Sequence, residues 1–450
     1  MRPTSILIAL LLTAGPLSAE PLSRAQAVQR ALEANPDVQK ALLDLQSLEG
    51  LKDEAKADAL PELTLAGSWN RYRDPSLLNS SSFDSFPPEL RDSLKPVPAN
   101  LYDGSLQLRQ TLFSFRLGAA IKGAKFARLL GDEAVRRARQ AVALAAVRAY
   151  NQHLLALEKV RVAEKVVRYK ERQLETAQNR FAAGVATELE VLRAQVDLAN
   201  TRTTLLQLQG EQDLSRAALN AVMLRPIDAP VEVSDRLEYR PLDMTLEQVV
   251  ARAWERRPEA AAIRLDERLY GELVKVARAD ALPSLDFVGQ WGYSVREPGN
   301  FFQADYEKWS AGVFLTVPVF DGWRTRGKVA QAQARASKVT QDRIALENSI
   351  RLEAQAALDA LRVAKSVLAA AELNVRQAQR ALDMIQANSQ AGAATFLDVL
   401  DAQAALTEAE SQRIQGLHTH ANARAFLRYV MADDVLADDA TPAADTAGQP

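Results

Sequence analysis

The residues with the clearest capacity for chemistry in this sequence are two aspartates, Asp398 and Asp401, in the stretch AGAATFLDVLDAQ. Side chains three positions apart lie on one face of a helix, so both carboxylates are expected to point the same way. Such a pair could line an aqueous pore or take part in catalysis. A related stretch earlier in the chain, AGVATELEVLRAQ, has Glu190 and Arg193 at the corresponding positions.

An enzyme would need further groups beside these acids, and the sequence offers few. Its three histidines are His153, His418 and His420, and it contains no HExxH, GxSxG, GxGxxG or phosphate-loop motif. His418 and His420 could touch a metal, but two histidines near a helix end are more often incidental. We therefore predict no catalytic residue, no metal site and no cofactor.

A structural role competes with a functional one for the same acids. Thr395 stands three residues before Asp398, which is the spacing of a capping box at the start of a helix. Thr187 stands in the same relation to Glu190, and the helix dipole also favours acids there. Asp398 can thus be mainly a capping residue, whereas Asp401 lies beyond the box and is harder to explain in that way.

Each of the two stretches also contains a glycine, Gly184 or Gly392, that interrupts a long helical pattern. Glycine readily adopts the left-handed conformation that ends many helices, so each is expected to turn one helix into the next. Ser114 and Asp321 stand at matching N-cap positions before the long helices. The acids are therefore expected near the turns of two helical hairpins.

These hairpins belong to a larger pattern, because the second half of the sequence repeats the order of features in the first half. LSRAQAVQRALEANPDV and MTLEQVVARAWERRPEA share a capping-box start and a proline in register, Pro36 or Pro258. Further along, QTLFSF matches VPVFDG. We predict two structural repeats, residues 20–240 and 241–430.

Each repeat changes its hydrophobic period to two between its short and its long helices. In PSLDFVGQWGYSV the apolar side chains fall on one face and the polar side chains on the other. We predict β-hairpins at about residues 62–113 and 284–320. Alternating strands of roughly ten residues with aromatic ends are typical of outer-membrane barrels. A half-buried sheet in a soluble domain would show the same alternation.

The segments that follow, about 114–224 and 321–430, are predicted to be long helical hairpins. Apolar or small residues recur there at alternating spacings of three and four, which is typical of a coiled-coil seam. In the second repeat the seam runs from Leu346 to Ile385 with Glu353 as its one exception. In the first repeat it consists of Tyr150, Leu154, Leu157, Val160, Ala163, Val167, Leu174, Ala177 and Phe181.

The two ends of the chain differ from the repeats in composition. Residues 1–19 have a basic residue, a short apolar run and small residues before Glu20, which indicates a signal peptide. No later stretch has the length of apolar residues that a membrane-spanning helix needs. Residues 431–450 are acidic and rich in alanine and proline, and we predict a disordered tail.

Bulk composition excludes several classes of protein and of site. A formal net charge of −2 over 450 residues gives no case for nucleic-acid binding, which favours a basic excess. The chain has no cysteine, so it can form neither a disulfide nor a cysteine-based zinc site, and it cannot carry a lipid on an N-terminal cysteine.

The strands impose a condition on how many chains act together. Two hairpins give four strands, which cannot close into a barrel, and lipid tolerates no open sheet edge. Strands in a membrane would therefore be shared among several chains. The order of these features, together with the segment PVFDG and the glycine-centred turns, resembles the TolC-type outer-membrane efflux proteins over about residues 20 to 430.

The resemblance implies a mixed α/β membrane channel. In such a homotrimer, a twelve-stranded β-barrel in the outer membrane of a Gram-negative bacterium continues as an α-helical coiled-coil barrel into the periplasm. The implied function is a passive exit duct for efflux or type I secretion, with a periplasmic adaptor, an inner-membrane transporter and outer-membrane lipid as partners. A periplasmic coiled-coil adaptor or tether is the alternative, although it does not readily account for the hairpins of strands.

The resemblance also implies roles for the turns. Asp398 and Asp401 would form carboxylate rings at the closed periplasmic entrance, where such rings favour cations. We further expect Glu190 and Arg193 to pair with neighbouring helices and to help hold the tip shut, because the basic residue that locks some relatives is replaced by Ala394. The tip residues implied as adaptor contacts are Ala183, Gly184, Val185, Ala391, Gly392 and Ala393.

Overall fold

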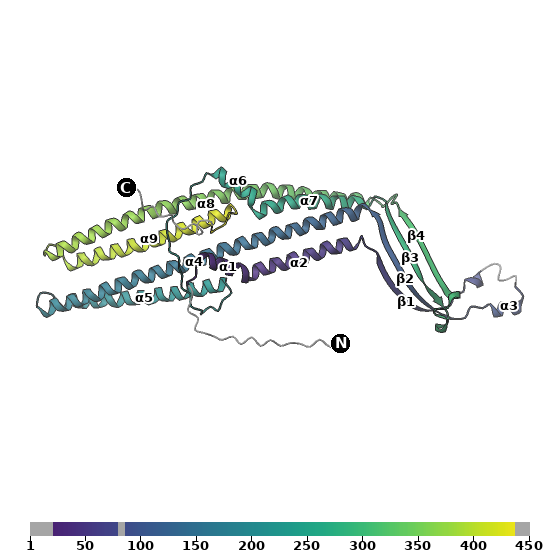
Figure 1. Cartoon of the computed structure of the whole chain (residues 1–450), viewed down its shortest axis with the longest axis horizontal. Helices are drawn as coiled ribbons and strands as arrows, with labels where there is room; N and C mark the ends of the chain where they lie inside the picture. The colour runs from purple at the N-terminus through teal and green to yellow at the C-terminus, as the bar shows by residue number, and fades with distance from the viewer. Residues whose placement is uncertain (1–20, 80–85, 437–450) are drawn as a thin grey trace, which may run out of the picture. The chain divides into compact units, whose positions relative to one another are not determined.

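The computed structural model of this chain describes residues 21–79 and 86–436. The predicted signal peptide and residues 437–450 of the predicted tail lie outside the described residues. Long helices and one sheet make up most of the described chain (Figure 1). In chain order the main elements are α1 (Arg24–Ala34), α2 (Pro36–Ala57), β1 (Glu62–Tyr72), α3 (Pro88–Ser93), β2 (Ala99–Ser114), α4 (Phe115–Ala182), α5 (Glu188–Val222), α6 (Leu246–Arg256), α7 (Pro258–Ala279), β3 (Ser284–Val295), β4 (Glu307–Thr316), α8 (Arg324–Gln390) and α9 (Phe396–Val430).

The chain forms two compact units, and each takes segments from both halves of the sequence. The first unit comprises the described residues within 1–43, 133–261 and 345–450, and the second comprises those within 44–132 and 262–344. The two proposed repeats, residues 20–240 and 241–430, are inferred from similarity within the sequence. The compact units divide the chain at other points, so the repeat boundaries stay a prediction.

The short helices begin as their sequences predict. At the start of α1 and of α6, an N-cap side chain and a glutamine three residues later exchange hydrogen bonds with each other's backbone N–H, which confirms both capping boxes. Pro36 and Pro258 then open α2 and α7, where the N–H that proline lacks would have no helical partner. The capping pairs are Ser23 with Gln26 and Thr245 with Gln248.

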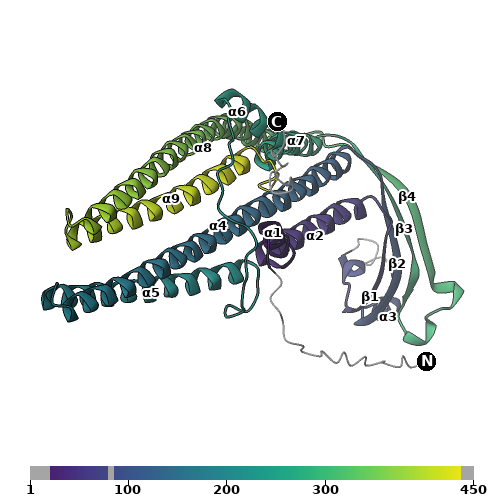
Figure 2. The ribbon, with the colours of Figure 1, turned by 60° about the vertical axis from the view of Figure 1, so that its left-hand side comes forward.

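The second unit contains one antiparallel sheet with its strands in the order β1-β2-β3-β4, and the sheet is visibly curved (Figure 2). Paired residues share a face, and one face is apolar. One row across it consists of Leu65, Leu106, Trp291 and Trp309. Leu65 is 81 % exposed and Trp309 is 73 % exposed, so no described part of the chain covers this face.

The opposite face of the sheet carries hydrogen-bonding and charged side chains. Lys308 Nζ lies 2.6 Å from Asp103 Oδ1 on this face, between different strands. A row across all four strands consists of Thr64, Gln107, Gln290 and Ser310. The predicted division into a polar and an apolar face is therefore confirmed.

The last strand is shorter than predicted. β4 ends at Thr316, whereas the sequence pattern extended it to Phe320. Pro318 has no N–H to donate, so it cannot continue the ladder of hydrogen bonds. The residues after Thr316 keep an alternating pattern without the pairing of a strand.

The start of α8 also differs from the prediction. Gly322 and Trp323 adopt φ angles of +66° and +65°, and this left-handed turn delays the helix to Arg324. Asp321 therefore lies before the turn, although its Oδ2 still accepts a hydrogen bond of 2.7 Å from the N–H of Thr325. Ser114 is the last residue of β2, and its Oγ accepts a 3.3 Å bond from the N–H of Leu117 in the first turn of α4.

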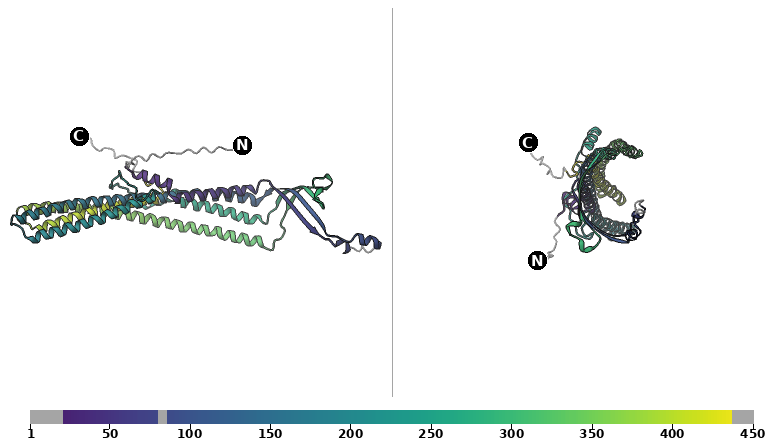
Figure 3. Two further views of the ribbon diagram at one scale, coloured as in Figure 1. Left: turned by 90° about the horizontal axis from the view of Figure 1, so that it is seen from below. Right: turned by 90° about the vertical axis from the view of Figure 1, so that its right-hand side faces the viewer.

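In the first unit, long helices fold back on shorter ones to form the hairpins α4–α5 and α8–α9 (Figures 1 and 3). The predicted seam of α8 is buried or half-buried throughout. At the one exception, Glu353, the next residue Ala354 takes the seam position and is fully buried. The Oε2 atom of Glu353 instead lies 2.5 Å from Nη1 of Arg257. In α4 the seam prediction is confirmed up to Ala177 and wrong at Phe181, which is 47 % exposed.

A buried tyrosine ties distant segments of the first unit together. The hydroxyl of Tyr150 lies 2.8 Å from the carbonyl oxygen of Leu22 and 2.8 Å from Asp235 Oδ2. The same Asp235 oxygen accepts a bond of 2.6 Å from the N–H of Arg24. Burial raises the pKa of the Tyr150 phenol well above its usual value, so the hydroxyl keeps its one hydrogen for the two acceptors beside it.

Within residues 21–79 and 86–436, no helix contains a run that is both long and apolar enough to cross a membrane.

The close packing of β2 on β3 makes Gly292→Ala a sharp test of the sheet. A methyl group there would stand 2.1 Å from the carbonyl oxygen of Gly104 and 2.6 Å from the Cα of Ser105. We expect destabilisation of about 1–3 kcal/mol, measured as a lower midpoint in thermal unfolding followed by the β-sheet circular-dichroism signal. Gly299→Ala is the matched control because nothing lies within 4 Å of its added carbon, and an equal loss in both variants would contradict the prediction.

Candidate functional site at the helix turns

The two long helices end in the same way at their turns. Gly184 and Gly392 adopt φ angles of +71° and +76°. The N–H of Val185 bonds the carbonyl oxygen of Arg180 at 3.0 Å, and the N–H of Ala393 bonds that of Asn388 at 2.8 Å. With the bonds made by the glycine N–H groups themselves, this is the Schellman arrangement that satisfies the last carbonyls of a helix.

The helices that leave the turns start differently from one another. Thr395 Oγ1 accepts a bond of 3.2 Å from the N–H of Asp398, and Asp398 Oδ2 accepts one of 2.8 Å from the N–H of Thr395. Thr187 Oγ1 accepts a bond of 3.4 Å from the N–H of Glu190, and among the described residues Glu190 returns none. Of the two helices that leave the turns, only α9 therefore has a complete capping box.

Asp398 takes part in the cap without using its whole carboxylate. Oδ2 accepts both the backbone bond and a bond of 2.6 Å from the hydroxyl of Thr395, while Oδ1 accepts none from the described residues. These bonds, that from the hydroxyl first, lower the pKa of Asp398 below its ordinary value of 3.8. The group thus stays charged while it caps the helix, so a capping role does not exclude an electrostatic one.

Asp401 lies on an exposed stripe of α9. It makes no hydrogen bond or ion pair within the part of the chain that the structure describes, so its charge is open to solvent or to another chain. The opposite side of α9 is buried against α8, where Ala402 and Leu406 pack with Leu382. The exposed stripe consists of Asp398, Asp401, Ala405, Glu408 and Gln412.

Glu190 and Arg193 occupy the corresponding positions of α5 without a partner of their own. Glu190 is half-buried and Arg193 is exposed, and neither side chain bonds another described residue. Any pairing of Arg193 with a neighbouring helix would therefore involve a second chain. The structure does not bring these two residues together with Asp398 or Asp401 through any contact.

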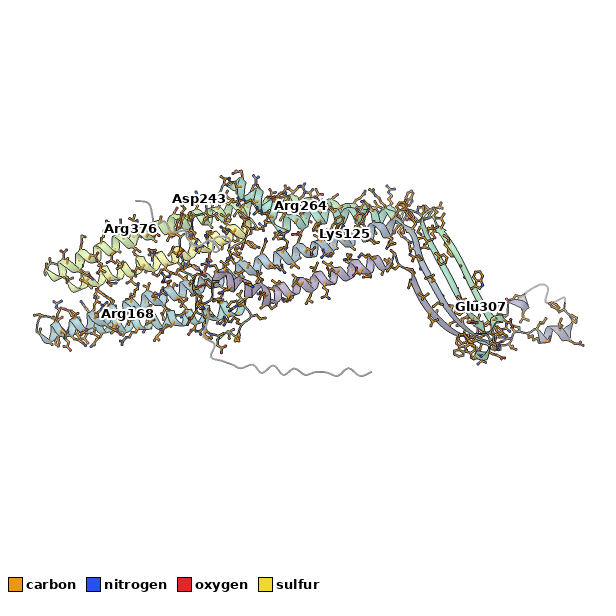
Figure 4. The ribbon with its side chains drawn as sticks, viewed as in Figure 1. Lys125, Arg168, Asp243, Arg264, Glu307 and Arg376 are labelled. Carbon is orange, nitrogen blue, oxygen red and sulfur yellow. The ribbon has the colours of Figure 1, made fainter. Side chains whose placement is uncertain are left out.

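Ion pairs join the two helices of the α4–α5 hairpin, and sequence reasoning missed them. Lys170 Nζ lies 2.5 Å from Asp197 Oδ2, and two further pairs enclose longer stretches of the hairpin. Near their turn, α8 and α9 pack through small and apolar side chains. Arg168 of α4 and Arg376 of α8 mark the two hairpins in Figure 4. The other two pairs are Arg202 with Glu171 and Lys159 with Glu211.

The three histidines do not form a site of their own. In the described part of the chain no three potential metal-binding side chains gather. His418 Nε2 lies 2.9 Å from Asn422 Nδ2, and the ring of His420 lies 4.7 Å from that of Tyr239. Burial lowers the pKa of His153 to about 4, so this side chain is neutral in its bond with Ser215.

The unequal caps predict unequal effects of removing the two threonines. Thr395→Val should cost about 1 kcal/mol of local helix stability and raise the pKa of Asp398 towards its ordinary value, because the hydroxyl bond is lost. Hydrogen exchange of the backbone N–H groups in the first turn of α9 measures the first effect. Thr187→Val is the matched control and should have the smaller effect on α5, since its single bond is long; a larger effect there would contradict the completed box.

Comparison with known families and proteins identifies the family to which the chain belongs. The family model described as "Outer membrane efflux protein" matches residues 27–223 and 249–432. The chain is 27% identical to the alkaline protease secretion protein AprF of Pseudomonas aeruginosa over 68% of this chain and 63% of AprF. It is 25% identical to the outer membrane protein TolC of Escherichia coli over 68% of this chain and 61% of TolC. The matched part therefore spans less than two thirds of either relative.

Solved structures agree with this assignment at the level of the fold. The outer membrane protein VceC of Vibrio cholerae superposes with a TM-score of 0.76 at 20% identity, over 92% of this chain and 96% of that chain. A membrane protein of Pseudomonas aeruginosa gives 0.76 at 24% identity, over 91% and 92% of the two chains. The family is one of outer-membrane channels, not of enzymes. The chain therefore belongs to the outer membrane efflux protein family and is a protein of the outer membrane.

Proposed function

We propose that the chain is the outer-membrane exit duct of a tripartite efflux or type I secretion system. The observation that carries the proposal is the sheet, whose apolar face is uncovered and whose edge strands β1 and β4 have no further partner among the described residues. Its strands of 10 to 16 residues are long enough to cross a bilayer. An open edge cannot remain in lipid, so β1 must pair with β4 of another chain.

The number of chains follows from the strands. Three chains of four strands each would give a barrel of twelve strands, with the polar face of each sheet lining a water-filled interior. The helical hairpins would continue this homotrimer as an α-helical coiled-coil barrel through the periplasm. We also propose that residues 20–240 and 241–430 are the two structural repeats of each chain.

The resting gate would lie at the turns of the hairpins. In a trimer, Asp398 and Asp401 of three chains would form two stacked carboxylate rings, which favour cations and keep a narrow passage hydrated. The charge that Asp398 keeps while it caps α9 supports this role. The exposed stripe that follows them on α9 would face the same water-filled lumen.

The duct would do no chemistry and would work passively. Energy would come from an inner-membrane transporter, and a periplasmic adaptor would dock at the turns and widen the entrance. The proposed contacts are exposed in the single chain, which leaves them open to a partner. They comprise Ala183, Gly184, Val185, Ala391, Gly392 and Ala393. AprF is named for secretion of alkaline protease, and this supports protein cargo as one candidate class.

Neutralising both proposed rings tests the gate. Asp398→Ala/Asp401→Ala should lose the preference for cations and the block by multivalent cations, because the carboxylates that attract them are gone. Reversal potentials and cobalt titrations in planar bilayers measure both effects. Glu188→Ala removes an exposed acid from the first turn of α5, off the proposed rings, and should leave both unchanged. Unchanged selectivity in the double variant would remove Asp398 and Asp401 from the gate. A chain that is soluble without detergent and conducts no ions would point to the adaptor instead.

Arg193 tests whether the other hairpin helps to hold the entrance shut. Because Arg193 has no partner among the described residues, a locking role requires a bond to another chain. Arg193→Ala should then raise the resting conductance of the trimer in planar bilayers. Arg180→Ala, an exposed arginine in the last turn of α4, is the control. A resting conductance equal to that of the unaltered chain would rule the lock out.

A further inference from the structure

A groove of about 420 Å³ lies in the second unit, where β2 passes into α4 beside the end of α7. Part of its wall is apolar and exposed: Phe113 is 51 % exposed, Phe115 is 50 % exposed, and the two rings meet edge to face with centroids 4.9 Å apart. Leu282 completes this side of the groove. Four charged side chains from α4 and α7 also line the groove.

The register of the sheet fixes the face on which the groove opens. Phe113 lies opposite Leu285, which lies opposite Leu315, so Phe113 belongs to the apolar face. At the far end of the same face, Trp291 Nε1 donates a bond of 2.6 Å to Glu307, which is labelled in Figure 4. The apolar band thus ends in polar groups on both sides, and the groove lies at its helix-proximal end.

Three cations and one carboxylate line the charged part of the groove. Lys122, Lys275 and Arg278 are all exposed there. Glu272 is only 8 % exposed, and its Oε1 accepts a bond of 2.7 Å from Lys275 Nζ. Its Oε2 is buried and has no hydrogen-bond partner within the described chain. A buried carboxylate oxygen without a donor is costly, and a bound ligand that supplies an N–H would remove that cost.

We propose that this groove binds the headgroup of a phosphoethanolamine lipid. The phosphodiester is an anion that Lys122 and Arg278 can hold by charge-assisted hydrogen bonds. The adjacent primary ammonium supplies the donor that Glu272 Oε2 lacks, and the aromatic side chains cover the start of the acyl chains. A phosphoglycerol headgroup offers the phosphate without the ammonium, and a choline headgroup offers a cation without an N–H.

The position of the groove suits a lipid that borders the channel. The inference rests on the proposed function, because it requires the apolar face to lie in a bilayer. Lys122 stands seven residues into the helix after Phe115, on the order of 10 Å below the apolar band, which is the depth of a headgroup layer. The groove adjoins the central strands β2 and β3, so pairing of the edge strands between chains leaves it uncovered.

Native mass spectrometry of the detergent-purified assembly tests the proposal. Lipids with identical acyl chains and ethanolamine, glycerol or choline headgroups are titrated in separate experiments. The unaltered protein should retain the ethanolamine lipid best. Lys122→Ala and Arg278→Ala should each weaken its binding about tenfold, the expected loss of one charge-assisted hydrogen bond. Glu272→Gln should instead abolish the preference for ethanolamine over glycerol while binding of the glycerol lipid persists.

Lys125→Ala is the matched control, since Lys125 is an exposed lysine of α4 that does not line the groove (Figure 4). Equal retention of all three lipids, or equal weakening by Lys125→Ala and Lys122→Ala, would overturn the proposal. Competition by soluble phosphoethanolamine as effective as that by the lipid would overturn the assignment to a membrane lipid. Conductance in bilayers of choline lipid alone separates the two ideas: a conducting channel without headgroup selectivity refutes only the lipid site, and a non-conducting protein refutes the duct.

Discussion

The unpaired edges of the four-stranded sheet are the constraint on which the rest of the structure depends. Backbone N–H and C=O groups along β1 and β4 must find partners, and hydrocarbon offers none. The two faces of the sheet add a second demand, because one is apolar and uncovered while the other is polar. Under the proposed function, a single chain would therefore supply one segment of a barrel wall that further chains complete. The carboxylates at the helix turns would form rings only in that assembly, whereas the groove at Phe113 is lined by a single chain.

The helices satisfy their packing needs in two contrasting ways. Alanine-rich seams let α8 and α9 approach closely, and Gly416 lies against the backbone of Leu368, where an added carbon would stand 3.4 Å from its Cα. In the α4–α5 hairpin, ion pairs supplement the seam. Near the turns burial is therefore concentrated along one side of each helix, whereas α4 is buried on several sides around Tyr150.

Patterns of spacing predicted much of this fold. The period of two gave the correct faces of the sheet, and the spacings of three and four gave the seam of α8 apart from Glu353. Spacing predicts which face of its own helix or strand a side chain occupies. It does not predict which residues of other elements contact that side chain. Glu353 left the seam because Arg257, distant in sequence, bonds it, and the ion pair of Lys170 with Asp197 escaped notice for the same reason.

The candidate site shows the same limit more sharply. Thr187 with Glu190 and Thr395 with Asp398 have identical spacing, yet only Asp398 completes the box. The spacing is necessary for the box, but the reciprocal bond depends on where the carboxylate lies in the folded chain. Lys122, Lys275 and Arg278 were likewise invisible as a group, because they come from two helices that only the folded sheet brings side by side. The ion pairs between α4 and α5 also make that hairpin sensitive to the medium. The pairs of Arg202 with Glu171 and of Lys159 with Glu211 are partly exposed, so dissolved salt screens them, while Lys170 is largely buried beside Asp197 and its pair is screened less. Rising ionic strength would therefore weaken the links of this hairpin unequally along its length.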